Sequence, residues 1–211
     1  MAITPQLHGM MILFVAAVVL AVWAAGRSAR KKEAADKAAR RLGYGVVTLW
    51  VAYNVYYFLP SVFEWSLSLP LHVCDVLAPV TLLALARNNR KARAILYFGA
   101  LPFAGQVILT PVGNQDPALL RFWFYWSFHA GLLAASFFDF SIRSFRPRPA
   151  DLASAFAFDI CYVLVILPID VLFSWDYGYI GNAVPDVSTI INKVGPWPQR
   201  VFVLLGISFA L

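Results

Sequence analysis

The sequence is poor in charge and in the residues that hold metals or form disulfides. Only 13% of its 211 residues are charged, and it contains two cysteines and three histidines. An ordinary soluble domain is roughly a quarter charged. The low charge and a hydrophobic fraction of 61% exclude a disordered chain, a nucleic-acid-binding module and an ordinary water-soluble enzyme. The composition instead predicts an all-α, polytopic transmembrane helix bundle that forms one domain over residues 1–211.

Long apolar runs separated by short loops predict about seven membrane crossings. A transmembrane helix needs about 20 predominantly apolar residues. The runs lie at residues 9–26, 42–63, 71–86, 94–111, 122–140, 153–175 and 197–211. The two halves of the chain show no internal repeat, which argues against several classes of transporter.

The basic residues are distributed unevenly between the loops. The first, third and fifth loops hold 14 of the 17 Lys and Arg residues, and the others hold only Arg121, Lys193 and Arg200. Cytoplasmic loops of membrane proteins carry the excess of basic residues. This predicts an N-terminus outside and a C-terminus in the cytoplasm. We interpret residues 27–41, which are rich in Ala, Lys and Arg, as a short helical or solvated cytoplasmic linker.

Polar residues inside the predicted spans gather in one half of the membrane. Such residues are costly in lipid and often mark function. At 1.5 Å per helical residue, eight of the nine residues considered lie in the outer half, namely Asn54, His72, Cys74, Asp75, Gln106, Thr110, His129 and Asp170, and the ninth, Asp159, lies in the inner half. The pattern predicts a pocket that opens toward the outer leaflet, or else a polar structural core.

Cys74 is the most reactive of these groups, because a thiolate is a strong nucleophile. Its span starts near Pro70, which predicts that Cys74 lies in the second helical turn, where the helix dipole contributes little. His72 is about 200° away around that helix, so a base must come from another helix. His129 lies at a similar depth. Two interpretations stay open: a catalytic Cys74–His129 dyad, or a buried cysteine and a core histidine bonded to a carbonyl.

The other polar residues have binding or structural interpretations. His72 and Asp75 share a helix face, where they could pair with each other, bind a lipid head group or form a structural ion pair. Gln106 could donate to an oxyanion or form a hydrogen bond between helices. Asp170 could belong to the site, and we expect a structural role for Asp159.

The sequence predicts neither a disulfide nor a cofactor. Cys74 and Cys161 differ in predicted depth by more than a disulfide can bridge. The histidines lack the paired spacing of a metal site, and no phosphate-binding loop is present. We therefore expect no metal and no nucleotide. The long loop at residues 176–200 is interpreted as a plain connection or as one that carries a short interfacial helix at 187–194 above the pocket.

Several motifs resemble those of YwaF-type integral membrane proteins of bacteria. In order, they are Leu69-Pro70-Leu71-His72-Val73-Cys74-Asp75, Gly105 to Pro111, Phe122 to Gly131, Tyr177-Gly178-Tyr179 and Gly195-Pro196-Trp197-Pro198. That family is distantly similar to the eukaryotic transmembrane-protein-164 acyltransferases, which move a fatty acyl chain from a phospholipid to a lysophospholipid with a cysteine nucleophile. The resemblance implies that Cys74 is the nucleophile, that His129 matches the family histidine and that the chain resides in a bacterial cytoplasmic membrane. Asp176 departs from the pattern, since the family usually has Asn there.

Together these observations predict a lipid acyltransferase or acyl hydrolase that forms a thioester near the outer leaflet. Cys74 would attack the ester, His129 would accept the thiol proton, and Gln106 or His72 would donate to the oxyanion. The remaining residues expected to bind substrate are Asp75, Thr110, Asp170 and Tyr177.

Two other functional classes stay open: a transporter of lipids or small molecules, and a noncatalytic membrane component. Transport that survives Cys74→Ser would indicate the first. The expected partners are membrane lipids and not nucleic acid. The sequence indicates no particular protein partner.

Overall fold

The computed structural model of the protein describes residues 3–29, 31–112, 115–182 and 191–210. Every regular element within these ranges is helical, which confirms the all-α class. The longer helices are α1 (Pro5–Arg27), α2 (Lys32–Tyr57), α3 (Val73–Arg87), α4 (Arg90–Ile95), α5 (Leu101–Leu109), α6 (Leu120–Ser141), α7 (Pro149–Phe173) and α8 (Gln199–Ala210). Single 3-10 turns occur at Tyr177–Tyr179 and Ile191–Val194.

The helices follow the predicted apolar runs closely, with two informative differences. Most of the predicted linker at 27–41 is the start of α2, because Ala, Lys, Arg and Glu are good helix formers. The fourth run is a continuous helix from Arg90 to Leu109 that contains a π-helical turn at Leu96–Ala100. Pro102 follows this turn, and the wider turn suits a proline that has no N–H to donate.

The exposed surface of the outermost helices is apolar. Three helices, α1, the segment Arg90–Leu109 and α7, are long and apolar enough to cross a membrane, judged by length and composition. Large side chains point outward from them and from α8; Leu172 is 75% exposed and Phe202 is 72% exposed. Extensive exposed apolar surface of this kind is typical of contact with lipid. The protein is thus a membrane protein with several apolar helices, and the count of seven crossings stays a prediction.

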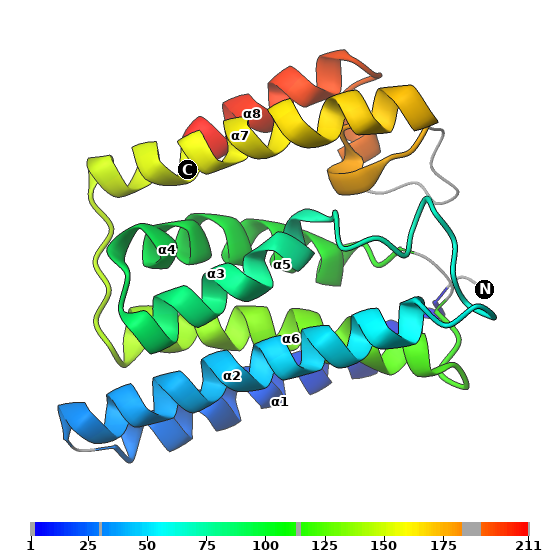
Figure 1. Cartoon of the computed structure of the whole chain (residues 1–211). Helices are drawn as coiled ribbons and strands as arrows, with labels where there is room; N and C mark the ends of the chain where they lie inside the picture. Colours follow the sequence, from blue (N-terminus) through cyan, green and yellow to red (C-terminus); the bar gives the residue numbers. More distant parts are fainter. Residues whose placement is uncertain (1–2, 30, 113–114, 183–190, 211) are drawn as a thin grey trace.

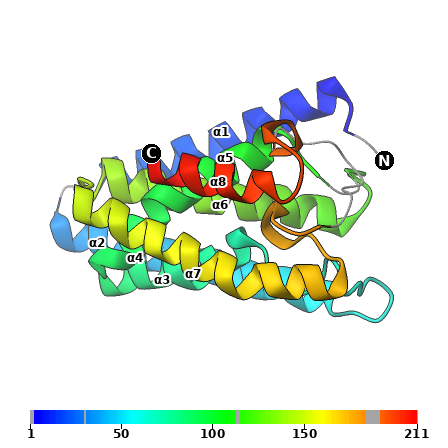
Figure 2. The same ribbon diagram turned by 90° about the horizontal axis from the view of Figure 1, so that it is seen from above.

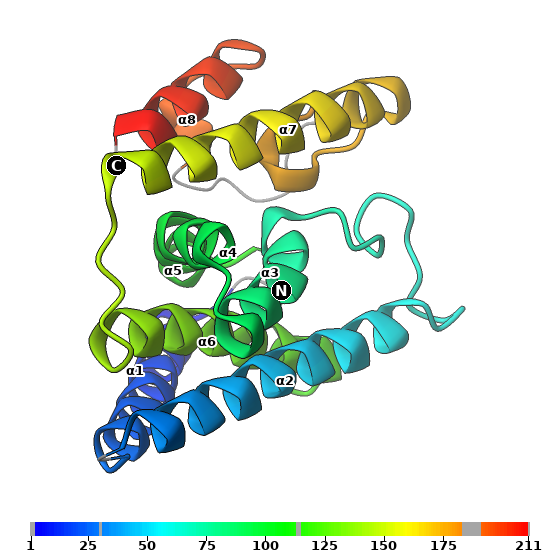
Figure 3. The same cartoon turned by 60° about the vertical axis from the view of Figure 1, so that its left-hand side comes forward.

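The helices are arranged in three layers (Figures 1 and 3). One layer contains α1, α2 and α6, the middle layer contains α3, α4 and α5, and the last contains α7 and α8. α2 packs against α3 and α6, α1 packs against α6, and α7 packs against α4 and α8. The largest cluster of buried side chains includes Leu77, Leu85, Leu96, Leu132 and Phe138, so the core lies around the middle layer.

The connections between helices lie at two opposite ends of the bundle (Figures 1 and 2). The α1–α2, α3–α4 and α6–α7 connections lie at one end, which we call the basic end because most Lys and Arg residues are near it. Residues 58–72 and 174–182 lie at the other end, where α1 begins. The structure therefore separates the loops in the way that their charge predicts.

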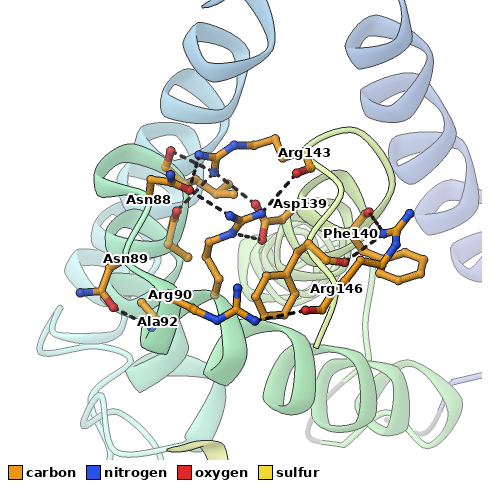
Figure 4. A network of polar contacts seen from close by, with 12 residues as sticks. Asn88, Asn89, Arg90, Ala92, Asp139, Phe140, Arg143 and Arg146 are labelled. Atoms are coloured by element: carbon orange, nitrogen blue, oxygen red, sulfur yellow. Dashed lines mark hydrogen bonds and ion pairs between the residues drawn. The ribbon is translucent and has the colours of Figure 1, made fainter. Parts of the chain in front are cut away.

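A buried ion network ties the helices together at the basic end (Figure 4). Asp139 of α6 accepts from Arg93 Nε at 2.8 Å and from Arg143 Nη1 at 3.1 Å. The side chains of Asp139 and Arg143 are only 2% and 6% exposed. Arg143 Nε also pairs with Asp36 of α2 at 3.1 Å. Each of these charges has an opposite partner, so the network joins α2, α4 and α6.

Two further polar contacts involve α7. Its first-turn residue Asp151 binds the Arg90 guanidinium at 3.0 and 2.6 Å, which fixes the start of α7 against α4. Deeper in the helix, the Ser208 hydroxyl of α8 donates to Asp159. This contact gives Asp159 a position between two helices, in keeping with the structural role expected for it.

Candidate functional site

A cavity of about 450 Å³ lies toward the end of the bundle opposite the basic end. It is lined by the last turns of α2, the start of α3, the second half of α5, the first half of α6 and residues of the α2–α3, α5–α6 and α7–α8 connections. The cavity brings together five residues selected from the sequence, namely His72, Cys74, Asp75, Gln106 and His129. Thr110, Asp170 and Tyr177 are not among its lining residues.

Cys74 lies in the first turn of α3, and the prediction of the second turn is wrong. His72 is the N-cap residue, with extended backbone angles (φ −66°, ψ 150°), so the helix begins at Val73. Pro70 therefore precedes the helix and does not open it. In the first turn the positive end of the helix dipole stabilises negative charge, so it contributes at Cys74 after all.

His72 lines the same cavity as Cys74, and its backbone is not part of the helix. The expected separation of about 200° applies only to residues with helical backbone angles. The Gly178 N–H donates to His72 Nδ1 in a long hydrogen bond of 3.4 Å. A ring nitrogen that accepts is unprotonated, so the proton of the neutral imidazole is on Nε2. His72 thus offers an N–H donor from a cavity-lining position.

His129 of α6 has the opposite arrangement of its ring nitrogens. Its Nδ1 lies 2.7 Å from the Tyr125 carbonyl oxygen, one helical turn earlier. A carbonyl can only accept, so Nδ1 carries the proton and Nε2 has the basic lone pair. This carbonyl contact is the one that the structural interpretation of His129 anticipates. The same contact also orients a general base, because it fixes which nitrogen is free to accept a proton.

Asp75 and Gln106 have partners that the sequence did not indicate. The Trp50 indole N–H of α2 donates to Asp75 Oδ1 at 3.0 Å, so the side chain of Asp75 pairs with α2 and not with the His72 imidazole. The Gln106 side-chain nitrogen donates to Thr110 Oγ1 at 2.7 Å, one turn along the same stretch of chain. This contact is local. The hydrogen bond between two helices that one interpretation of Gln106 expected is not the contact that the side-chain nitrogen makes.

Tyr177 is fully buried and supports the residues that surround the cavity. Its hydroxyl donates to the Trp65 carbonyl at 2.7 Å and accepts from the Leu69 N–H at 3.1 Å. Its ring packs against His72, with 4.8 Å between the ring centroids. Tyr177 therefore holds residues 58–72 and the imidazole in place and does not face the cavity.

Gly178 allows the loop after α7 to approach His72. Its φ of +65° is in the left-handed region, which side chains disfavour. A Cβ at this position would also lie 2.9 Å from Tyr162 Cε1. The Tyr162 hydroxyl in turn donates to the Leu71 carbonyl at 2.7 Å, next to His72. The glycine therefore lets α7, its following loop and the start of α3 meet at one point.

Asp176 keeps a hydrogen-bonding role although the family pattern has Asn. Its Oδ1 accepts from the Gly181 N–H and from Arg200 Nη2, each at 2.9 Å. Burial raises the pKa of Asp176 to about 6, and the Arg200 guanidinium opposes this shift. Asp176 thereby fastens the loop that lines the cavity to α8. Of the interfacial helix expected at 187–194, only Ile191–Val194 belongs to the described residues, where it forms a 3-10 turn.

Among the described residues, Asp170 and the two cysteines have no polar side-chain partner that would mark them as part of a metal site or a disulfide. Asp170 is fully buried in α7, and neither of its side-chain oxygens has a hydrogen-bond partner in the described part of the chain. Both cysteines are free; Cys74 is buried and Cys161 is exposed on α7. No cluster of three or more potential metal ligands occurs within the described ranges.

Sequence reasoning missed several polar residues that line the cavity, among them Tyr53, Tyr57, Arg121 and Tyr125. The tyrosines lie in aromatic stretches that are normally assigned to the membrane interface. Arg121 had a visible signal, since it is one of only three basic residues in the less basic set of loops. An isolated arginine beside an aromatic stretch is thus a candidate binding residue even where no sequence motif includes it.

Comparison with known proteins identifies the family of the chain. No curated protein and no solved structure matches it. A family model described as the TMEM164 family matches residues 3–211, nearly the whole chain. This match bears out the TMEM164-like part of the resemblance seen in the motifs. The protein, with its cavity around Cys74 and His129, belongs to the TMEM164 family.

Proposed function

We propose that the protein transfers or hydrolyses the fatty acyl groups of phospholipids through a thioester at Cys74. The observation that carries the proposal is that Cys74, in the first turn of α3, and His129, with a free basic nitrogen, line the same cavity. Membership of the TMEM164 family supports it, because the Cys74 motif resembles the nucleophile motif of the eukaryotic acyltransferases.

The first half of the reaction forms the thioester. The Cys74 sulfur attacks the ester carbonyl carbon while His129 Nε2 accepts the thiol proton. The oxyanion of the tetrahedral intermediate receives a hydrogen bond from His72 Nε2–H. Collapse of the intermediate breaks the ester C–O bond, and the lysolipid oxygen leaves with the proton from His129. The acyl group then remains on sulfur.

The second half regenerates the enzyme. A lysophospholipid hydroxyl attacks the thioester carbonyl, and His129 accepts the hydroxyl proton. The thiolate leaves and receives this proton back, which completes the transfer. Water as the attacking group would release a fatty acid, so the choice between transferase and hydrolase depends on which nucleophile reaches the cavity.

His72 suits the oxyanion role better than Gln106. The tautomer imposed by Gly178 leaves His72 Nε2–H as a donor, and the Tyr177 ring packs against the imidazole. The Gln106 nitrogen already donates to Thr110 at 2.7 Å, so only its second N–H is free. Donors that are fixed before the reaction stabilise a developing charge most effectively.

The proposed topology places this chemistry near the outer leaflet. Seven crossings with the N-terminus outside and the C-terminus in the cytoplasm of a bacterial cell are supported by the separation of the basic connections from the cavity end (Figure 1). In this orientation the cavity is close to the outer interface. Cysteine accessibility labelling of single-cysteine variants in intact cells tests the orientation. Labelling of the basic end from outside would contradict it.

Intact mass measurement tests the thioester directly. The purified protein is incubated with mixed bacterial phospholipids beside two variants, Cys74→Ser and Cys161→Ser. We expect a hydroxylamine-sensitive mass increase of one acyl chain in the wild type and in Cys161→Ser, and none in Cys74→Ser. The Cys161 variant is a matched control, because it removes the other free thiol, which lies on the exposed face of α7.

Lipid turnover is measured in the same reactions. Turnover that requires Cys74 but leaves no adduct indicates rapid breakdown of the thioester and supports the proposal. Absence of both adduct and turnover with all donors rejects it. Transport of lipid that survives Cys74→Ser would then establish the transporter alternative.

A further inference from the structure

The cavity contains a cation that forms no ion pair with any residue described in the structure. Arg121 is the only lysine or arginine among the described residues that line the cavity. Its Nε is buried and has no hydrogen-bond partner in the described part of the chain. A guanidinium presents five donors and stays charged, so an unpartnered buried nitrogen is costly. Arg121 therefore has unused capacity to bind an anion.

The carboxyl groups of the cavity do not supply that anion. None of the ion pairs between described residues includes Arg121. Each lining carboxyl group has another partner, which is Trp50 for Asp75, Arg200 for Asp176 and Ser66 for the exposed Glu64. The acidic residues are thus engaged or solvated, and the guanidinium is left for a ligand.

The stability of α6 does not explain an arginine at this position. Arg121 is the second residue of α6, which begins at Leu120 without a side-chain cap. The N-terminus of a helix carries partial positive charge, so a cation there is unfavourable. An anion beside Arg121 would interact favourably with both the guanidinium and the helix end.

We infer that Arg121 binds the phosphate group of the lipid substrate and thereby selects phospholipids over neutral glycerides. The inference deepens the proposed function and rests on it for the identity of the reacting ester. A planar guanidinium matches phosphate oxygens in a bidentate fashion. The phosphate of a glycerophospholipid is only a few bonds from its esters, so one cavity of about 450 Å³ accommodates both. Ligand cavities commonly have this size, and the acyl chains would extend into the bilayer.

Binding to a variant that cannot turn over tests the inference separately from the chemistry. Cys74→Ser is reconstituted in nanodiscs, and binding of lysophosphatidylglycerol and of a monoacylglycerol with the same chain is measured by native mass spectrometry. Arg121→Gln in this background should weaken lysophosphatidylglycerol binding roughly 10- to 100-fold, the usual value of a charged hydrogen bond. Binding of the monoacylglycerol should be unchanged.

Two further variants make the result specific. Arg121→Lys keeps the charge but loses the planar bidentate donors, so its binding should lie between that of the unsubstituted residue and that of Arg121→Gln. Misfolding of Arg121→Gln would not explain such an order. Lys193→Gln removes an exposed basic residue near the start of α8 and should leave both lipids unaffected. Thermal unfolding of all variants is recorded in the same nanodiscs.

The outcomes separate the phosphate site from the enzyme. Equal weakening of both lipids, or no weakening of either, overturns the inference. The site would be assigned to free phosphate if millimolar inorganic phosphate displaces the bound lipid and lysophosphatidylglycerol binds no better than monoacylglycerol. That result would overturn the inference that Arg121 binds a lipid head group. Arg121-dependent binding in a protein whose wild type shows no adduct and no turnover would keep the phosphate site and reject the proposed enzyme.

Discussion

The two ends of the bundle hold their polar groups in different ways. At the basic end, Asp139 lies between two arginines, and Asp151 binds a third in bidentate fashion. At the cavity end, Arg121 has a buried nitrogen with no partner among the residues that the structure describes. Two histidines there each use one ring nitrogen for a backbone group, at Gly178 and at Tyr125, and no described residue binds the other nitrogen.

This difference separates structural from functional polar groups. A buried charge with all of its partners in place stabilises packing, and removal of one partner is costly. A buried polar group with an unused donor or acceptor lowers the stability of the fold. Such groups occur where the unused atom binds a ligand or takes part in a reaction.

The largest effect expected concerns the two residues proposed for catalysis. His129→Ala and Cys74→Ala should each lower acyl transfer at least 10²- to 10⁴-fold, because a positioned base contributes about this much and the nucleophile has no substitute. Their unfolding temperatures should change by only a few degrees. Turnover is followed by lipid mass spectrometry and folding by thermal shift. Loss of folded protein in both variants would indicate that the pair is structural.

Removal of Asp139 tests the other side of the comparison. Asp139→Ala leaves Arg93 and Arg143 without their shared carboxylate and should lower stability by ~3–5 kcal/mol. Asp36→Ala is the control, since its side chain is 36% exposed and its ion pair should contribute less than ~1 kcal/mol. Denaturation in mild detergent measures both. The Cys74 adduct per folded molecule should be unchanged, and similar losses in the two variants would contradict this account.

Gly178→Ala sharpens the comparison at the cavity end. An alanine at a φ of +65° that also meets the Tyr162 ring should cost ~1–3 kcal/mol. The displaced loop would weaken the support of His72 and lower turnover by more than stability alone predicts. Gly206→Ala is the control, because a Cβ there has no neighbour within 4 Å. Thermal shift and limited proteolysis at residues 174–182 give the readouts; equal behaviour of both variants would reject this role.

The last effect expected is the pH dependence that Asp176 imposes, which develops only gradually as the pH changes. Its pKa of about 6 in the folded protein is above the ordinary value of about 3.9, so the folded state binds more protons between these values. The stabilising contribution is fully present below about pH 4 and is lost as the pH rises through 6. Asp176→Asn, which cannot ionise, should therefore gain ~1–3 kcal/mol relative to the wild type between pH 4 and 7. Unfolding at several pH values measures it, and a difference that does not vary with pH would contradict it.

The sequence by itself determined the helical class, the order and approximate bounds of the helices, and the separation of the basic loops. These follow from local chemistry, because hydropathy, helix propensity and charge act over a few neighbouring residues. The sequence also selected Cys74 and His129, since ionisable groups are conspicuous in an apolar chain. It failed at the start of α3, where Pro70 was taken to open the helix and His72 was treated as a helical residue.

Only the tertiary structure decided which polar groups meet and which of their atoms stay free. The partner of Asp75 is Trp50 on another helix, and the tautomer of His72 depends on Gly178, more than a hundred residues away. Such contacts depend on how each helix is rotated and on how closely its neighbours approach, which packing across the whole bundle sets. For the same reason the sequence showed Arg121 only as a charge in a loop, and the fold showed that it lines the cavity, with an Nε that has no partner in the described ranges.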